Sequence, residues 1–167
     1  SWWDCNAYYD EAGNYVYCAD SPGAMGMGVP SAIASALRDP ERQVVCFAGD
    51  GGFLMTGNEM IAAVERNLPV RFIVSNNASY GTIRLYQERN HPDRELATSL
   101  CNPDFVLLAE AYGLKGFKIE ADDDIKPAIA EAFAVDGPSL IEVKTSLEYI
   151  SAFTTISQIR SSQTAAS

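Results

Sequence analysis

The chain has 167 residues, of which 47% are hydrophobic and 20% are charged, as is ordinary for one globular domain with a buried core. Its formal charge of −10 argues against binding to nucleic acid or anionic lipid, because both need a basic surface. No apolar run approaches the roughly 18 residues that cross a membrane, and the first residues lack the pattern of a signal peptide, so we expect a cytoplasmic protein without membrane contact.

Residues 1–20 are rich in tryptophan and tyrosine. Burial of aromatic rings is the simplest explanation, so we expect this segment to be part of the same domain as the residues after it. From 24 to 37, small residues and an early proline, Pro30, predict a helix that packs closely against a neighbour. The glycines at 23, 26 and 28 are not in the order of a dinucleotide-binding loop, which disfavours a Rossmann site.

Two apolar runs of strand length, 44–48 and 70–74, flank a stretch with helical spacing. A strand, helix, strand unit of this kind makes the two strands parallel and brings their carboxyl ends together. We therefore expect Asp50 and Asn77 to meet, although they are far apart in the sequence. Carboxylate and amide oxygens are ligands that Mg²⁺ or Ca²⁺ takes, so the unit predicts a metal site.

Gly51 and Gly52 follow the aspartate and have no side chain, so an anion can approach their backbone N–H groups near the next helix. A metal and an anion site together indicate a metal-bridged diphosphate. Further on, 56–59 has the residues of a capping box, which predicts a helix from about 57 to 67.

The alternation of strands and helices continues downstream. We expect a polar loop over 87–102 that can close over a site, a helix over 103–112, a strand over 114–120, a helix over 122–135 and a strand over 140–144. The pattern predicts an α/β fold, a three-layer sandwich with a mostly parallel, doubly wound sheet whose ligand lies at the carboxyl ends of the strands. Residues 146–167 are expected to form a polar C-terminal arm.

Other residues with metal-binding chemistry have structural explanations. Cys46 lies inside a predicted strand and is read as a small buried hydrophobe. His91 is expected to be solvated, and the acidic run Asp122–Asp124 is explained by the dipole of the helix that begins there.

Three sequence blocks carry a family resemblance. Gly49-Asp50-Gly51, then 24 residues (52–75), then Asn76-Asn77 resembles the thiamine-diphosphate motif of the superfamily of acetolactate synthase and benzoylformate decarboxylase-like enzymes. The likeness continues in 21–30 upstream and 76–84 downstream, and it covers roughly 21–145. Residues 21–145 therefore resemble the C-terminal, diphosphate-binding domain of these enzymes.

The resemblance implies thiamine diphosphate and Mg²⁺ as cofactors. It implies that Asp50, Asn77 and the backbone carbonyl of Ser79 hold the metal ion. The residues that it places at the cofactor are Gly23, Ala24, Met25, Gly49, Asp50, Gly51, Gly52, Asn77, Ser79 and Tyr80.

Some of these implied roles compete with simpler ones. The position of Met25 implies a wedge that bends the cofactor, whereas a plain core methionine is the alternative. The resemblance implies that a helix begins at Gly81 and that Thr82 and Ile83 help shape a substrate pocket for a 2-oxo acid, whereas ordinary first-turn helix residues are the alternative.

The resemblance also implies parts that this chain does not supply. In the family, the glutamate that activates the cofactor comes from a separate pyrimidine-binding domain or subunit, and no carboxylate here matches it. We therefore expect a fragment or one subunit of a larger enzyme, inactive alone and homodimeric through an exposed apolar face. The alternatives are a non-catalytic cofactor-binding or interaction module and, disfavoured for lack of a Walker lysine, a nucleotide binder.

Overall fold

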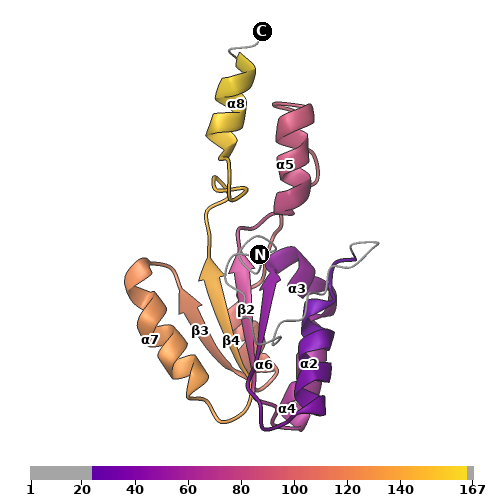
Figure 1. Cartoon of the computed structure of the whole chain (residues 1–167), viewed down its shortest axis with the longest axis vertical. Coiled ribbons are helices and arrows are strands. Elements are labelled where there is room, and N and C mark those ends of the chain that lie inside the picture. Colours follow the sequence, from indigo (N-terminus) through magenta and orange to yellow (C-terminus); the bar gives the residue numbers. More distant parts are fainter. Residues whose placement is uncertain (1–23, 165–167) are drawn as a thin grey trace.

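The computed structural model describes residues 24–164, and the predicted aromatic segment 1–20 lies outside them. Four strands form one sheet: β1 (Val44–Gly49), β2 (Val70–Asn76), β3 (Lys115–Ile119) and β4 (Ser139–Lys144). Their order is β1-β2-β4-β3 and all three neighbouring pairs are parallel (Figure 1). The predicted parallel α/β sheet is thus confirmed.

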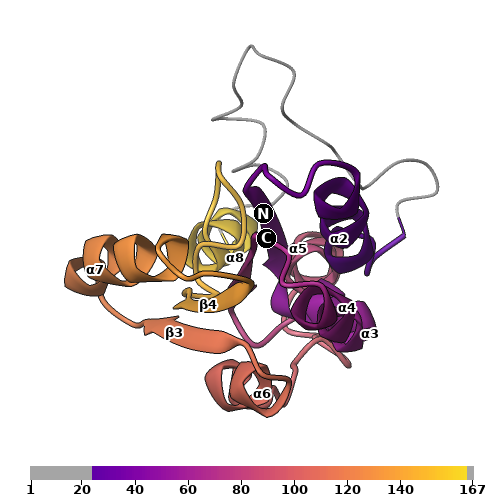
Figure 2. The ribbon, with the colours of Figure 1, turned by 90° about the horizontal axis from the view of Figure 1, so that it is seen from below.

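Helices cover both faces of the sheet. One face packs on α2 (Gly28–Arg38), α3 (Asp50–Thr56), the 3₁₀ turn η1 (Gly57–Glu59), α4 (Met60–Glu65) and α6 (Phe105–Ala111). The other face packs on α7 (Asp122–Phe133), through a smaller core that contains Ile119, Ala132 and Ile141. Figure 2 shows α6 and α7 on opposite sides of β3, which confirms the three-layer arrangement.

The stripe of small and branched residues on α2 explains its close packing. Val29, Ala32, Ile33 and Ala36 are buried and recur at the spacing of one helix face. The side chain of Cys46 is also buried in this core, as predicted for a small hydrophobe. Within the described residues, no helix is long and apolar enough to cross a membrane.

The helix predicted from about 57 to 67 is present as the 3₁₀ turn η1 followed by α4, but the separate helix α3, which begins directly at Asp50, was not predicted. The expected capping box does not form. Instead, the Thr56 hydroxyl donates a hydrogen bond to the backbone oxygen of Gly26, at 2.6 Å. The two glycines at the start of α3 lower its intrinsic helix propensity, and tertiary packing around them overrides that preference.

The predicted polar loop over 87–102 is also too long, because α5 (Gly81–Asn90) continues to Asn90. Arg84 and Glu88 form a buried i, i+4 ion pair on this helix, with 2.7 Å between Nη2 and Oε1. Because charged residues occupy these buried positions, α5 has no apolar stripe, and its full length could not be predicted from the sequence.

The C-terminal arm contains a helix, α8 (Ile156–Thr164), which lies beside α5 above the carboxyl ends of the strands (Figure 1). Arg160 donates to both carboxylate oxygens of Glu88, at 2.9 Å and 2.8 Å. The Gln163 amide donates to the backbone oxygens of Glu88 and Arg89, each at 3.0 Å. Charged hydrogen bonds thus attach α8 to α5.

This attachment is expected to weaken in acid. Hydrogen bonds from Arg160, and then from Arg84, lower the pKa of Glu88. The stabilisation is therefore complete when the pH is above the ordinary glutamate pKa of about 4.3. It is lost as the pH falls through the lower pKa that Glu88 has in the folded protein. Glu88→Gln is expected to cost about 1–3 kcal/mol at pH 7 and to flatten the acid limb of the stability curve, measured by urea unfolding from pH 7 to pH 3. Glu110→Gln, an exposed change in α6, is the control, and an unchanged acid limb in Glu88→Gln would contradict the assignment.

Candidate functional site

Polar side chains meet where β1, β2 and β4 end. In the sheet, Gly49 pairs with Ser75, so the next residues on β1 and β2 are Asp50 and Asn76. The side-chain amide nitrogen of Asn102 donates to Asp50 Oδ2 at 2.7 Å and to Asn76 Oδ1 at 2.8 Å. One shared donor thus links Asp50 to Asn76, the residue before the Asn77 that the sequence predicted to meet Asp50, at the carboxyl ends of the strands below α5 and α8 (Figure 1).

In the part of the chain that the structure describes, the Asp50 carboxylate has neutral partners only. Its exposed fraction is 2%, and its Oδ1 accepts the backbone N–H of Gly51 at 2.9 Å. Its Oδ2 accepts the Asn102 amide, and the residues described by the structure give it no ion pair. A buried carboxylate without a compensating cation is costly, so this carboxylate is the natural place for one.

The loop after β2 presents further oxygen atoms. Asn77 Oδ1 accepts the backbone N–H of Ser79 at 3.0 Å, and the Ser79 carbonyl accepts that of Gly81 at 2.8 Å. Between them, Ala78 has a φ of 55°, a left-handed conformation that costs a residue with a side chain about 1–2 kcal/mol. Each of the two oxygens accepts one hydrogen bond and retains a lone pair.

The three predicted metal ligands offer hard oxygen donors, one carboxylate, one amide and one carbonyl, which is the donor chemistry that Mg²⁺ prefers. Among the described residues no three histidine, cysteine or acidic side chains gather. A metal ion at this edge would consequently depend on the amide and carbonyl oxygens as well as on Asp50.

The predicted diphosphate glycines occupy the first turn of α3. A Cβ on Gly51 would lie 2.6 Å from the Tyr80 ring, so glycine is required for the ring to pack there. A Cβ on Gly52 would meet the backbone nitrogen of Gly26 at 3.9 Å, and one on Gly49 would meet nothing within 4 Å. Tyr80, which the resemblance places at the cofactor, thus lies directly against this turn.

The segment around Thr98 and Leu100, just before α6, holds the loop that follows β2 in place. The backbone N–H of Tyr80 donates to the Thr98 carbonyl and that of Leu100 to the Ala78 carbonyl, both at 2.8 Å. The Ser79 hydroxyl also donates to the Thr98 carbonyl, at 2.9 Å. Sequence reasoning assigned 87–102 to a loop and missed both this pairing and Asn102.

The remaining predicted site residues that the structure describes lie on the surface. Met25 is 46% exposed, so the alternative of a core methionine is wrong, and Ala24 is exposed beside it. Thr82 and Ile83 are exposed in the first turn of α5, where they are accessible to a ligand. Gly23 lies outside the described residues.

Two alternatives to metal binding agree with the structure. His91 is exposed, as expected for a solvated side chain. In the acidic run that opens α7, the Asp124 carboxylate accepts the backbone N–H of Ala121 at 3.1 Å, so it serves the start of that helix.

Comparison with known proteins assigns most of the chain to a family. Residues 2–143 match the family described as "Thiamine pyrophosphate enzyme, C-terminal TPP binding domain". The chain is 36% identical over 122 residues to the mitochondrial acetolactate synthase catalytic subunit of Saccharomyces cerevisiae. These residues are 73% of this chain and 18% of the yeast protein.

Two bacterial proteins are similar to the same extent. The acetolactate synthase isozyme 2 large subunit of Escherichia coli is 34% identical over 122 residues, which are 72% of this chain and 22% of that protein. The acetolactate synthase large subunit of Parasynechococcus marenigrum is 36% identical over 123 residues, 72% of this chain and 20% of that protein. The chain thus spans about a fifth of the length of the relatives that it matches.

Proposed function

Because the chain belongs to the family of C-terminal, TPP-binding domains of thiamine pyrophosphate enzymes, we propose that it binds the diphosphate of thiamine diphosphate through Mg²⁺ where β1 and β2 end. The observation that carries the proposal is the buried Asp50 carboxylate, which has only neutral partners among residues 24–164. The oxygens of Asn77 and Ser79 lie on the neighbouring loop and complete a donor set of the right kind.

Each residue has a defined task in this proposal. Asp50, the Asn77 amide oxygen and the Ser79 carbonyl would hold the cation, while the turn that contains Gly51 and Gly52 would face the diphosphate. Gly23, Ala24 and Met25 would contact the pyrimidine ring, and the exposed Met25 side chain is free to do so. Thiamine diphosphate, when bound, supplies the nucleophilic carbon and the electron sink for reactions of 2-oxo acids.

The reaction that we propose is decarboxylation of a 2-oxo acid or carboligation of the acetolactate type, in keeping with the relatives named above. The chain would work with a pyrimidine-binding domain or subunit that brings the activating glutamate, in a homodimer. Large apolar side chains on the surface around the start of α2, on α3 and on α5 support a partner surface here; they are Met25, Met27, Leu54, Met55 and Ile83.

Calorimetry with the 167-residue chain tests the proposal. We expect thiamine diphosphate to bind with saturation when Mg²⁺ is present and not when a chelator removes it. Since ATP shares the phosphates but not the thiazolium and pyrimidine rings, it should not compete at equal concentration. Equal binding of ATP would favour the nucleotide-binding alternative, and no binding of thiamine diphosphate would contradict the proposed function.

We further expect the purified chain alone to leave pyruvate unchanged, because it lacks the activating glutamate. Activity should appear when the pyrimidine-binding domain of an acetolactate synthase is added. Cofactor binding without activity in that mixture would favour a non-catalytic module. Turnover by the chain alone would contradict the need for a partner.

A further inference from the structure

We infer that Asn76, Asn102 and Glu142 form a positioning network that holds the Asp50 carboxylate ready for the cation. The inference rests on the proposed function and extends it, because these three residues are not among the predicted ligands. They come from the end of β2, from the segment before α6 and from β4, and they meet at the same edge of the sheet.

The contacts form one continuous path. Glu142 Oε1 accepts a hydrogen bond from the Asn76 amide nitrogen at 2.6 Å. Asn76 Oδ1 accepts one from the Asn102 amide nitrogen at 2.8 Å, and the same nitrogen donates to Asp50 Oδ2 at 2.7 Å. Three parallel strand ends are thus joined through side chains alone.

Glu142 determines which group donates and which accepts in each of these hydrogen bonds. An ionised carboxylate can only accept hydrogen bonds, so Asn76 must turn its NH₂ group toward Glu142 and its oxygen toward Asn102. Asn102 must then present its own NH₂ group, which reaches the Asp50 carboxylate as well. Lys144 Nζ lies 2.7 Å from Glu142 Oε1 and supplies the counter-charge. The acceptor oxygen that β4 presents therefore fixes the orientation of two amides and, through them, of Asp50.

The network also shapes the second half of the site. Asn76 Oδ1 accepts the backbone N–H of Ala78 at 3.1 Å, in the turn that carries the predicted ligands Asn77 and Ser79. One amide therefore connects the carboxylate ligand on one loop with the amide and carbonyl ligands on the other. Hydrogen bonds that orient metal ligands in this way are worth about 10–100-fold in metal affinity.

Packing does not account for these residues. Glu142 is 1% exposed, and its Oε2 has no hydrogen-bond partner among the described residues. The Oδ1 atom of Asn102 is likewise buried without a partner there. Apolar side chains of similar size would fill the same space without this desolvation cost, so the polar groups indicate a role in the site.

The test measures affinity for Mn²⁺ by electron paramagnetic resonance, with the whole chain and saturating thiamine diphosphate. Asn102→Ala and Glu142→Leu are expected to raise the Kd of Mn²⁺ about 10–100-fold. Glu142→Gln should stay close to the wild type, because an amide oxygen can still accept the hydrogen bond from Asn76. Asn58→Ala, at an exposed asparagine in η1, is the matched control for removal of an amide.

Rescue by Glu142→Gln shows that the acceptor oxygen is required and not the charge, and urea unfolding of each variant separates positioning from a general loss of structure. If Glu142→Leu does not fold, Asn102→Ala still decides, since Asn102 is only half-buried. Wild-type affinity in folded Asn102→Ala would overturn the inference and leave the proposed function intact. A wild-type chain that binds no Mn²⁺ with the cofactor would overturn both.

Discussion

Replacement of Asp50 by asparagine is expected to raise the Kd of thiamine diphosphate with Mg²⁺ at least about 100-fold, which corresponds to about 2.7 kcal/mol. The change keeps the size of the side chain and leaves an oxygen that can accept the Asn102 hydrogen bond. It removes the negative charge of the carboxylate, which is the only charged ligand proposed for the divalent cation. Binding is therefore lost while the fold is kept, and calorimetry with circular dichroism measures both.

The matched control for this change is Asp123→Asn, at an exposed aspartate in the first turn of α7. It alters the net charge of the chain by the same amount, so any general effect on the approach of an anionic cofactor is subtracted. Cofactor binding by Asp50→Asn within threefold of the wild type would exclude Asp50 as the metal ligand.

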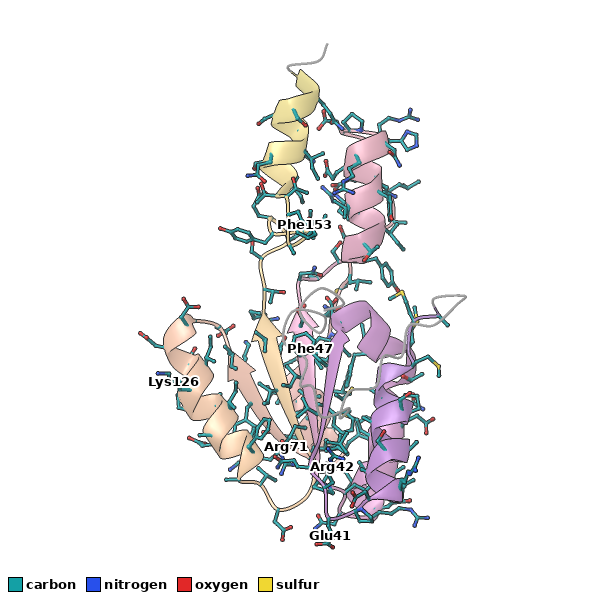
Figure 3. The ribbon with its side chains drawn as sticks, in the orientation of Figure 1. Glu41, Arg42, Phe47, Arg71, Lys126 and Phe153 are labelled. Atoms are coloured by element: carbon teal, nitrogen blue, oxygen red, sulfur yellow. The ribbon has the colours of Figure 1, made fainter. Side chains whose placement is uncertain are left out.

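The second large effect is expected on stability. Arg71 is 2% exposed on β2, and its guanidinium donates to the backbone oxygens of Val135, at 2.7 Å, and Gly137. Phe133, at the end of α7, accepts a longer bond of 3.4 Å. Figure 3 shows Arg71 at the end of the sheet opposite α5 and α8, so it stabilises the connection from α7 to β4 and not the cofactor site.

Arg71→Leu is expected to lower the free energy of unfolding by about 3 kcal/mol, because it leaves two or three carbonyl oxygens without their donor. Burial lowers the pKa of Arg71, but its ordinary value lies so far above neutrality that the charge is kept, and a cation at a helix C-terminus is favourable. Urea unfolding measures the loss, with the exposed Arg42→Leu as control (Figure 3). A difference below 1 kcal/mol between the two variants would contradict this role.

The sequence was sufficient for the strands and for the convergence of two loops. Apolar runs of strand length and the helical stretch between them predict a parallel pair, and the parallel register then brings the residues after Gly49 and Ser75 together. The polar residues at the strand ends could be found because they follow directly after the apolar runs that form the strands.

The supporting residues were missed for identifiable reasons. Asn102 lies in a polar segment without periodicity, and its contact with Asp50 depends on how the chain returns to α6. Glu142 was hidden inside the last strand, although an acidic residue between Ile141 and Val143 in a buried run is itself a signal. The early start of α3 was missed because Gly51 and Gly52 have low helix propensity, which packing against Tyr80 overrides.

The most direct test of the account is a crystal structure of the chain grown with thiamine diphosphate and Mn²⁺, in which anomalous scattering locates the metal ion. We expect one strong peak within coordination distance of an Asp50 carboxylate oxygen, Asn77 Oδ1 and the Ser79 carbonyl oxygen, with the diphosphate beside Gly51. A bound cofactor whose metal ion lies elsewhere in the molecule, away from the ends of β1 and β2, would contradict the account.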